Sequence, residues 1–177
     1  VGIVPVVLSA RQCGIPLSIP QGPSVGVDRL VAASAAKARF GAPVVICDAG
    51  TAITVDLVAP DGSFAGGAIL PGPELWVSAL HSTALVRSGG FAAPAVPVGG
   101  TTAEAVNAGA FWGICGAIER LMAEFCRLAG PAPCVLTGGY APLFAGELHP
   151  RPHCIPDLVL EGIAAALIHG TTDAGGG

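Results

Sequence analysis

Asp48-Ala49-Gly50-Thr51-Ala52 connects two apolar runs, residues 43–47 before it and residues 53–58 after it. The two runs predict neighbouring strands, and the pentapeptide predicts the turn between them. An Asp at a strand end can hold a cation, Gly lets the backbone approach a phosphate, and Thr offers an amide and a hydroxyl. Asp and Gly are also ordinary turn formers. On these residues alone, a phosphate-binding turn and a simple strand reversal both remain open.

The composition predicts a folded chain that acts on a small molecule. The length of 177 residues suffices for one substantial core, or for one domain plus part of another. A hydrophobic fraction of 52% with only 11% charged residues argues against disorder and favours a buried sheet with apolar helices. The eight basic residues are spread along a chain of net charge −4 and form no stripe for nucleic acid. No apolar run approaches the length of a membrane span, so we expect no membrane association.

The cysteines and histidines do not predict a metal site. Neither residue type shows the short paired spacing of zinc ligands or redox motifs, so the thiols are interpreted as buried apolar groups. No basic leader with a cleavage site is recognisable, and unpaired thiols suit a reducing compartment. We therefore expect a cytoplasmic protein.

The periodicity predicts a mixed α/β arrangement. We expect a three-strand meander followed by helices and then a strand–helix–strand–helix series, which together suggest a mixed sheet covered by helices. The expected strands are residues 3–8, 44–48, 52–58, 64–70, 134–136 and 153–155. The expected helices are residues 25–40, 74–86, 101–128, 142–148 and one that begins at 157, with a disordered tail at 171–177.

Several further motifs accompany the central turn, and their order resembles that of type III pantothenate kinases. The motifs are Gly26-Val27-Asp28-Arg29, Gly66-Gly67-Ala68-Ile69-Leu70-Pro71-Gly72, Thr102, Thr137-Gly138-Gly139 and Pro156-Asp157-Leu158-Val159-Leu160-Glu161-Gly162. The resemblance extends from about residue 14 to residue 169. It implies an actin-like, ribonuclease-H-like fold that forms a homodimer and phosphorylates pantothenate from ATP at the first step of coenzyme A synthesis.

Residues 26–29 match the part of the family that binds the acceptor. The resemblance makes Asp28 the catalytic base toward the pantothenate hydroxyl, a role that suits a carboxylate because phosphoryl transfer depends on alignment of the nucleophile. Gly26, Val27 and Arg29 match the segment that lines the substrate, and a guanidinium suits the carboxylate of pantothenate. The alternatives are an Asp that stabilises the helix dipole and an Arg that is solvated.

The remaining matches concern ATP, cations and the dimer. Asp48 matches a site for K⁺ or NH₄⁺, Thr51 and the adjacent Gly50 match the contact with the ATP phosphates, and Mg²⁺ is expected to offset phosphate charge. Gly138 and Gly139 resemble the turn near the adenosine, although paired glycines after a strand are common. Thr102 matches a threonine that binds pantothenate near the dimer interface, and a helix cap is the equal alternative.

One departure from the family concerns the nucleotide cleft. Members of the family carry an Asp-x-Gly-Asn-Thr loop on their first strand, and no such loop occurs in these 177 residues. We therefore expect residues 1–40 to be a remnant of the first actin-like half with the connecting helix, and residues 41–170 to be the second half. A non-catalytic, dimerising or regulatory relative is the alternative function. A kinase of the actin-like superfamily acting on a sugar or a small acid is a third.

Overall fold

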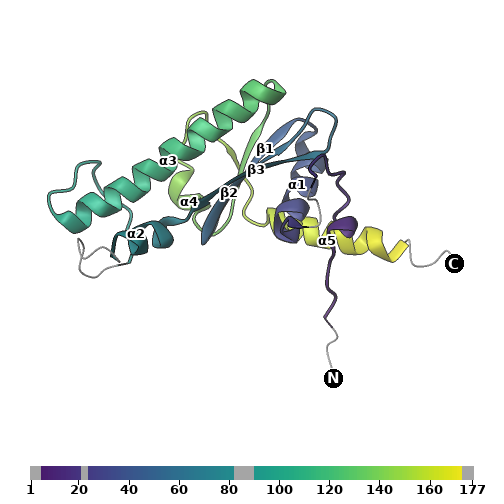
Figure 1. The fold of residues 1–177 in the computed structure, drawn as a ribbon, viewed down its shortest axis with the longest axis horizontal. Helices are drawn as coiled ribbons and strands as arrows, with labels where there is room; N and C mark the ends of the chain where they lie inside the picture. Colours follow the sequence, from purple (N-terminus) through teal and green to yellow (C-terminus); the bar gives the residue numbers. More distant parts are fainter. Residues whose placement is uncertain (1–4, 21–23, 82–89, 173–177) are drawn as a thin grey trace.

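A mixed five-stranded sheet forms the centre of the computed structural model, which describes residues 5–20, 24–81 and 90–172 (Figure 1). The strand order is β3-β2-β1-β4-β5. Strand β2 runs antiparallel to both of its neighbours, whereas β1, β4 and β5 pair in parallel. The bounds are β1 Val44–Ala49, β2 Ala52–Val58, β3 Phe64–Pro71, β4 Cys134–Thr137 and β5 His153–Cys154. The meander expected from the sequence is therefore present.

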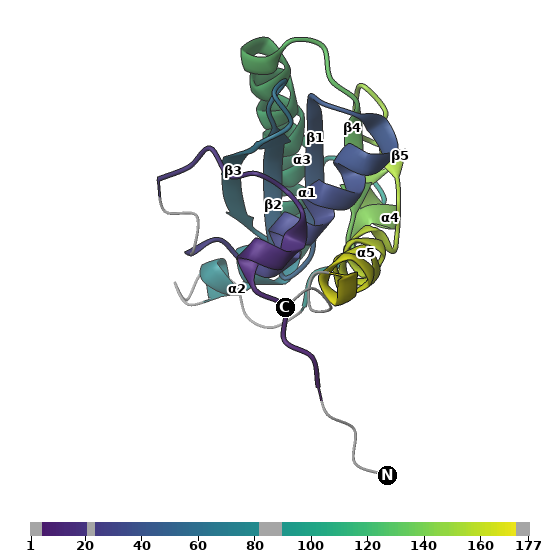
Figure 2. The same ribbon diagram turned by 90° about the vertical axis from the view of Figure 1, so that its right-hand side faces the viewer.

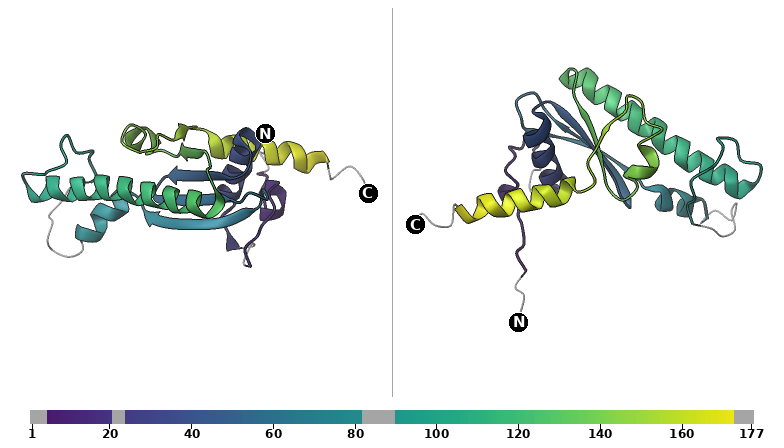
Figure 3. Two further views of the ribbon diagram at one scale, coloured as in Figure 1. Left: turned by 90° about the horizontal axis from the view of Figure 1, so that it is seen from above. Right: turned by 180° about the vertical axis from the view of Figure 1, so that it is seen from behind.

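Helices cover both faces of this sheet (Figures 1 and 2). Helices α1 and α5 lie on one face, and the long helix α3 lies with α4 on the other, while α2 packs beside α3. Seen from above and from behind, α3 extends well past the sheet on the side away from α1 (Figure 3). The bounds are η1 Ala10–Cys13, α1 Val27–Phe40, α2 Pro73–His81, α3 Thr102–Ala129, α4 Ala141–Phe144 and α5 Leu158–Thr172.

The alternation of β1 assigns its side chains to the two faces. Val45 and Cys47 join the core against α3, whereas Val44 and Ile46 join the core against α1 and α5. Because successive side chains of a strand point to opposite faces, Asp48 lies on the α1/α5 face. This face therefore changes from apolar to polar at the carboxyl end of β1.

The structure corrects three of the expected boundaries. Residues 5–8, the described part of the expected first strand, are not in a strand, and a single bridge instead pairs Leu17 with Phe64. Helix α4 ends at Phe144 rather than at residue 148. Helix α5 continues through Thr172, so the first two residues of the expected tail are helical, while residues 173–177 lie outside the described part. The helix expected at residues 74–86 is described as α2 up to His81, and residues 82–86 lie outside the described part.

No helix in the part of the chain that the structure describes has the length and apolar character needed to cross a bilayer.

Candidate active site

Two turns meet at the edge of the sheet where the parallel strands β1 and β4 both end. Tyr140 N donates a hydrogen bond of 2.9 Å to the carbonyl oxygen of Ala49, which joins the turn after β4 to the turn after β1. Gly138 has φ +93°, and a Cβ there would lie 2.7 Å from Ala49 N and would overlap the Asp48 carboxylate. A side chain at this position is excluded by both backbone conformation and space. The glycine thus allows Asp48 and the second turn to approach closely.

A third segment supports the Gly50-Thr51 turn. Gly72, which precedes α2, donates its N–H to the Thr51 carbonyl oxygen at 2.9 Å. It is buried, and a Cβ at this position would overlap the carbonyl oxygens of Gly50 and Thr51. The Thr51 residue itself remains exposed. The structure therefore brings Asp48, Gly50, Thr51 and the Gly138-Gly139 pair together, with the threonine open to a ligand.

Asp48 lies in a cluster of negative charge. It is half-buried and pairs in register with Thr54 of β2 and Thr137 of β4. Burial raises the pKa of Asp48, and the negative charges of Asp28 and Asp56 raise it further. Asp28 lies in the first turn of α1, which packs on the face of the sheet that Asp48 also occupies, so the two carboxylates lie on the same side of the sheet.

Asp28 lies in the first turn of α1 and is exposed. Its Oδ1 accepts a hydrogen bond of 2.9 Å from Arg29 N. The same side chain lines a groove of about 350 Å³, together with Val27, Val31 and residues of α5 and of the N-terminal segment. An exposed carboxylate beside a groove is open to an incoming hydroxyl group.

The neighbouring Arg29 contacts a residue that the sequence analysis did not single out. Its Nε donates to Asp56 Oδ2 at 3.0 Å and to Oδ1 at 3.2 Å, and its Nη2 forms a further contact with Oδ1. The Asp56 residue is 2% exposed, so this is a buried ion pair. Burial raises the pKa of Asp56 and the Arg29 contacts oppose that rise, whereas the Asp56 hydrogen bond raises the pKa of Arg29. An Asp alternating with Thr54 in an otherwise apolar strand is the sequence signal that could have identified it.

Thr102 is not near Asp28 within one chain. It is the first residue of α3, and α3 begins at the end of the molecule remote from α1 (Figures 1 and 3). The helix-cap interpretation of Thr102 is wrong, because Thr101 is the cap: its hydroxyl accepts from Glu104 N at 3.2 Å, and Glu104 accepts from Thr101 N at 3.1 Å.

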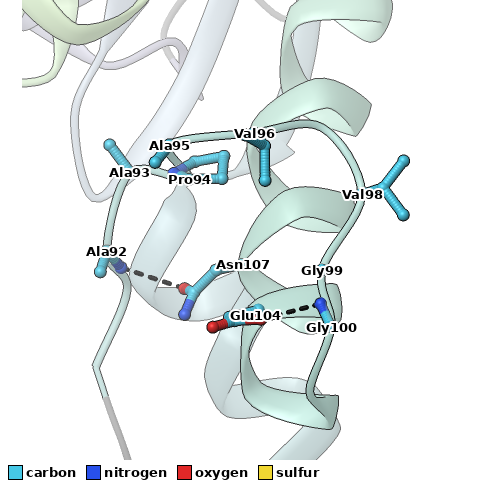
Figure 4. Close-up of a pocket in the computed structure, with 10 residues that line it drawn as sticks. All are labelled: Ala92, Ala93, Pro94, Ala95, Val96, Val98, Gly99, Gly100, Glu104 and Asn107. Carbon is cyan, nitrogen blue, oxygen red and sulfur yellow. Dashed lines mark hydrogen bonds between the residues drawn. The ribbon is translucent and has the colours of Figure 1, made fainter.

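A small pocket of about 290 Å³ adjoins this helix start (Figure 4). Its walls are a loop of small and apolar residues, and its polar groups already have partners: Asn107 accepts from Ala92 N at 3.0 Å, and Glu104 accepts from Gly100 N at 2.8 Å. The pocket therefore reflects how the loop is held against α3.

The side chains of the described residues include no group of three or more His, Cys, Asp or Glu placed to hold a metal ion. All six cysteines are free thiols. A cation at Asp48 would therefore take one carboxylate and complete its shell with backbone, ligand or water oxygens, as hard cations do. The donor set fits such an ion, because a half-buried carboxylate with a raised pKa, beside two further carboxylates, gains from added positive charge.

The sequence of the chain matches a known protein family over most of its length. The family described as type III pantothenate kinase matches residues 1–124. The chain belongs to the type III pantothenate kinase family. Its resemblance to these kinases, inferred above from the order of motifs, is confirmed.

Individual members of the type III pantothenate kinase family match most of the chain. The chain is 40% identical over 163 residues to a type III pantothenate kinase of Nocardia farcinica (strain IFM 10152), covering 89% of this chain and 62% of that protein. It is 38% identical over 153 residues to one of Acidiphilium cryptum (strain JF-5), covering 85% of this chain and 57% of that protein. The chain spans about three fifths of the length of the relatives it matches.

The fold class is confirmed by a solved structure. A Baf family protein from Campylobacter jejuni superposes with a TM-score of 0.64 at 22% identity, covering 92% of this chain and 72% of that one. At this identity the likeness concerns the fold alone. The mixed α/β arrangement of this chain is thus similar to the fold of that protein.

Proposed function

We propose that the protein acts as a type III pantothenate kinase, which transfers the γ-phosphoryl group of ATP to pantothenate. Family membership motivates the reaction class. The observation that carries the proposal is that Asp28, at the start of α1, and Asp48, at the end of β1, lie on the same face of the sheet. A reaction between an alcohol and a triphosphate needs a base and a cation site on the same side of the molecule.

In this proposal Asp28 is the catalytic base. Its exposed carboxylate accepts the proton of the acceptor hydroxyl as the oxygen attacks the γ-phosphorus and the bond from that phosphorus to the β,γ-bridging oxygen breaks. ADP leaves with the bridging oxygen. Gly26, Val27 and Arg29 line the acceptor site, and the groove beside Asp28 supports this placement because Val27 is part of its wall.

The turns at the sheet edge are proposed to hold the nucleotide. Gly50 and Thr51 offer backbone amides and a hydroxyl to the phosphates, and Gly138 and Gly139 lie toward the adenosine. Asp48 holds a monovalent cation, K⁺ or NH₄⁺, and Mg²⁺ neutralises phosphate charge when it is bound with ATP. The exposure of Thr51 and Gly139 supports these roles.

A homodimer is part of the proposal. Because α3 begins far from α1, Thr102 can reach an acceptor beside Asp28 only from a second copy of the chain. Exposed apolar side chains near the start of α3 suit an interface, with Val98 80% and Trp112 38% exposed. The six free thiols suit a cytoplasmic location.

The test is ATP-dependent formation of phosphopantothenate by the chain joined to the part of the Nocardia farcinica relative that it does not match. We expect pantothenate to be phosphorylated, while sugars and small hydroxy acids are rejected. Turnover of a sugar instead would identify another kinase. If calorimetry detects neither ATP nor pantothenate binding while the chain self-associates, the non-catalytic alternative is correct.

A further inference from the structure

The buried ion pair between Arg29 and Asp56 needs an explanation beyond stability. Asp56 lies inside β2, opposite Ile46 of β1 and Gly67 of β3. A buried ion pair loses much of its attraction to desolvation, and apolar replacements of similar size often give equal or greater stability. The Arg29 guanidinium donates hydrogen bonds to both carboxylate oxygens of Asp56. The pair therefore fixes geometry more than it adds to stability.

The surroundings of the pair are shaped to hold it. A Cβ at Gly67 would overlap both the Asp56 carboxylate and the Val55 carbonyl oxygen, so the position opposite Asp56 admits only glycine. On another side, the Arg29 guanidinium carbon lies 5.6 Å from the centroid of the fully buried Phe64 ring, within the range of a cation–π contact. Sheet and helix thus confine the guanidinium together.

The pair is linked directly to the proposed base. Arg29 follows Asp28 in the first turn of α1, and its own N–H donates to Asp28 Oδ1 at 2.9 Å. Consecutive Cα atoms are about 3.8 Å apart, so an arginine anchored in the sheet limits the movement of its neighbour. The first hydrogen bond of the helix, from Leu30 N to Gly26 O, is long at 3.4 Å and holds this turn only weakly. The anchor in β2 is therefore the stronger restraint on Asp28.

We propose that Asp56 is a positioning residue, which holds Arg29 and thereby sets the place of Asp28 relative to the Asp48 turn. Arg29 thus lines the acceptor site while its guanidinium is held by Asp56. This inference rests on the proposed function for its catalytic consequence, but the restraint on α1 is a property of the fold.

The restraint is measured by amide hydrogen exchange in the 177-residue chain with Asp56→Asn. We expect residues 26–31 to exchange about 10-fold faster, while residues 44–49 of β1 remain unchanged. The matched control is Glu161→Gln, on α5. It removes the exposed ion-pair partner of Arg39, which lies on α1 like Arg29, and it should leave the exchange rates of residues 26–31 unchanged. The proposal would be overturned if the exchange rates of residues 26–31 stayed unchanged. It would also be overturned if exchange became faster by the same factor throughout α1 and the sheet. If Asp56→Asn does not fold, Arg29→Lys carries the same expectations, because it keeps the charge but loses the planar fork.

The catalytic consequence is measured in the fusion protein of the pantothenate phosphorylation assay described above. Arg29→Gln, Asp56→Asn and the double variant should each lose about 100-fold in kcat, with the double no worse than either single, and KM for pantothenate should stay within about 3-fold. A raised KM in Arg29→Gln with normal kinetics in Asp56→Asn would mean that the arginine binds the acceptor directly. If the wild type phosphorylates nothing, the proposed function fails, while the exchange experiment still decides the role of Asp56.

Discussion

Replacing Gly138 by alanine should destabilise the fold and disturb the proposed cation site at Asp48, whereas the same change at Gly139 should leave both of these unchanged. Gly138 has φ +93°, in a region that residues with a side chain rarely adopt, and its Cβ would meet Ala49 N at 2.7 Å and overlap the Asp48 carboxylate. At Gly139 a Cβ would meet nothing within 4 Å. The two substitutions add the same methyl group to adjacent residues, so their difference isolates the geometry of the turn.

The size of the effect follows from the backbone conformation. A residue with a side chain held in such a conformation costs about 1–3 kcal/mol, and the contact with Ala49 places the Gly138→Ala variant toward the upper part of that range. In a chain of this size about 2 kcal/mol corresponds to a fall in Tm of about 4–8 °C. Gly139→Ala should stay within about 0.5 kcal/mol of the wild type.

The assay combines thermal unfolding with the response of stability to K⁺. We expect Gly138→Ala to unfold at lower temperature and to lose stabilisation by KCl, because Asp48 must move to accommodate the new methyl group. Gly139→Ala should keep both properties. Equal melting temperatures for the two variants would show that Gly138 does not hold the turns together as described.

Three further predictions concern the cap of α3, the charge of Asp48 and the core. Thr101→Ala removes the N-cap of α3 and should lower the free energy of unfolding by about 1 kcal/mol. Thr102→Ala should change that free energy by less than about 0.5 kcal/mol but should weaken pantothenate binding in calorimetry. If Thr102→Ala were the less stable of the two variants, the capping assignment would be refuted. Because burial and like charge raise the pKa of Asp48, the protonated side chain stabilises the fold below about pH 3.8 and this contribution is lost as the pH rises through the folded-state pKa. Asp48→Asn should therefore be more stable than the wild type at pH 7 in urea unfolding, with a difference that shrinks in acid and in KCl; a constant difference would contradict this. Phe144→Ala, at a fully buried ring stacked 5.5 Å from Phe111, should cost about 3–5 kcal/mol in the same assay, and a loss below about 1 kcal/mol would show that the core is described wrongly.

The local pattern of the sequence was sufficient to predict most of the fold. Strand β2 occupies the expected residues 52–58, because its alternating side chains and flanking turn residues define a strand whose Ile53, Val55 and Leu57 enter one core. Helix α3 begins directly after Thr101, because the capping box is a local signal. The expected first strand was wrong over its described part, because an apolar run becomes a strand only where a partner is free. The edge of the sheet is instead paired through Leu17.

The candidate site was predictable only in part. The motifs indicated Asp28, Asp48 and the glycines, and the structure brings these residues to one edge of the sheet. The partner of Arg29 was missed, because Asp56 is 27 residues away and their contact depends on how α1 packs against β2. The large separation of Thr102 from Asp28 could not be predicted from the sequence either, because it depends on the length of α3 and its direction across the sheet.

The measurement that bears most directly on the central claim is the rate of phosphopantothenate formation by Asp28→Asn in the chain joined to the part of the relative that it does not match. Removing a general base should lower this rate by about 100-fold or more, while ATP binding and Tm stay unchanged. The control is Glu147→Gln, which removes an exposed carboxylate beyond α4 on the opposite face of the sheet and should retain full activity. A rate in Asp28→Asn equal to that of this control would contradict the account.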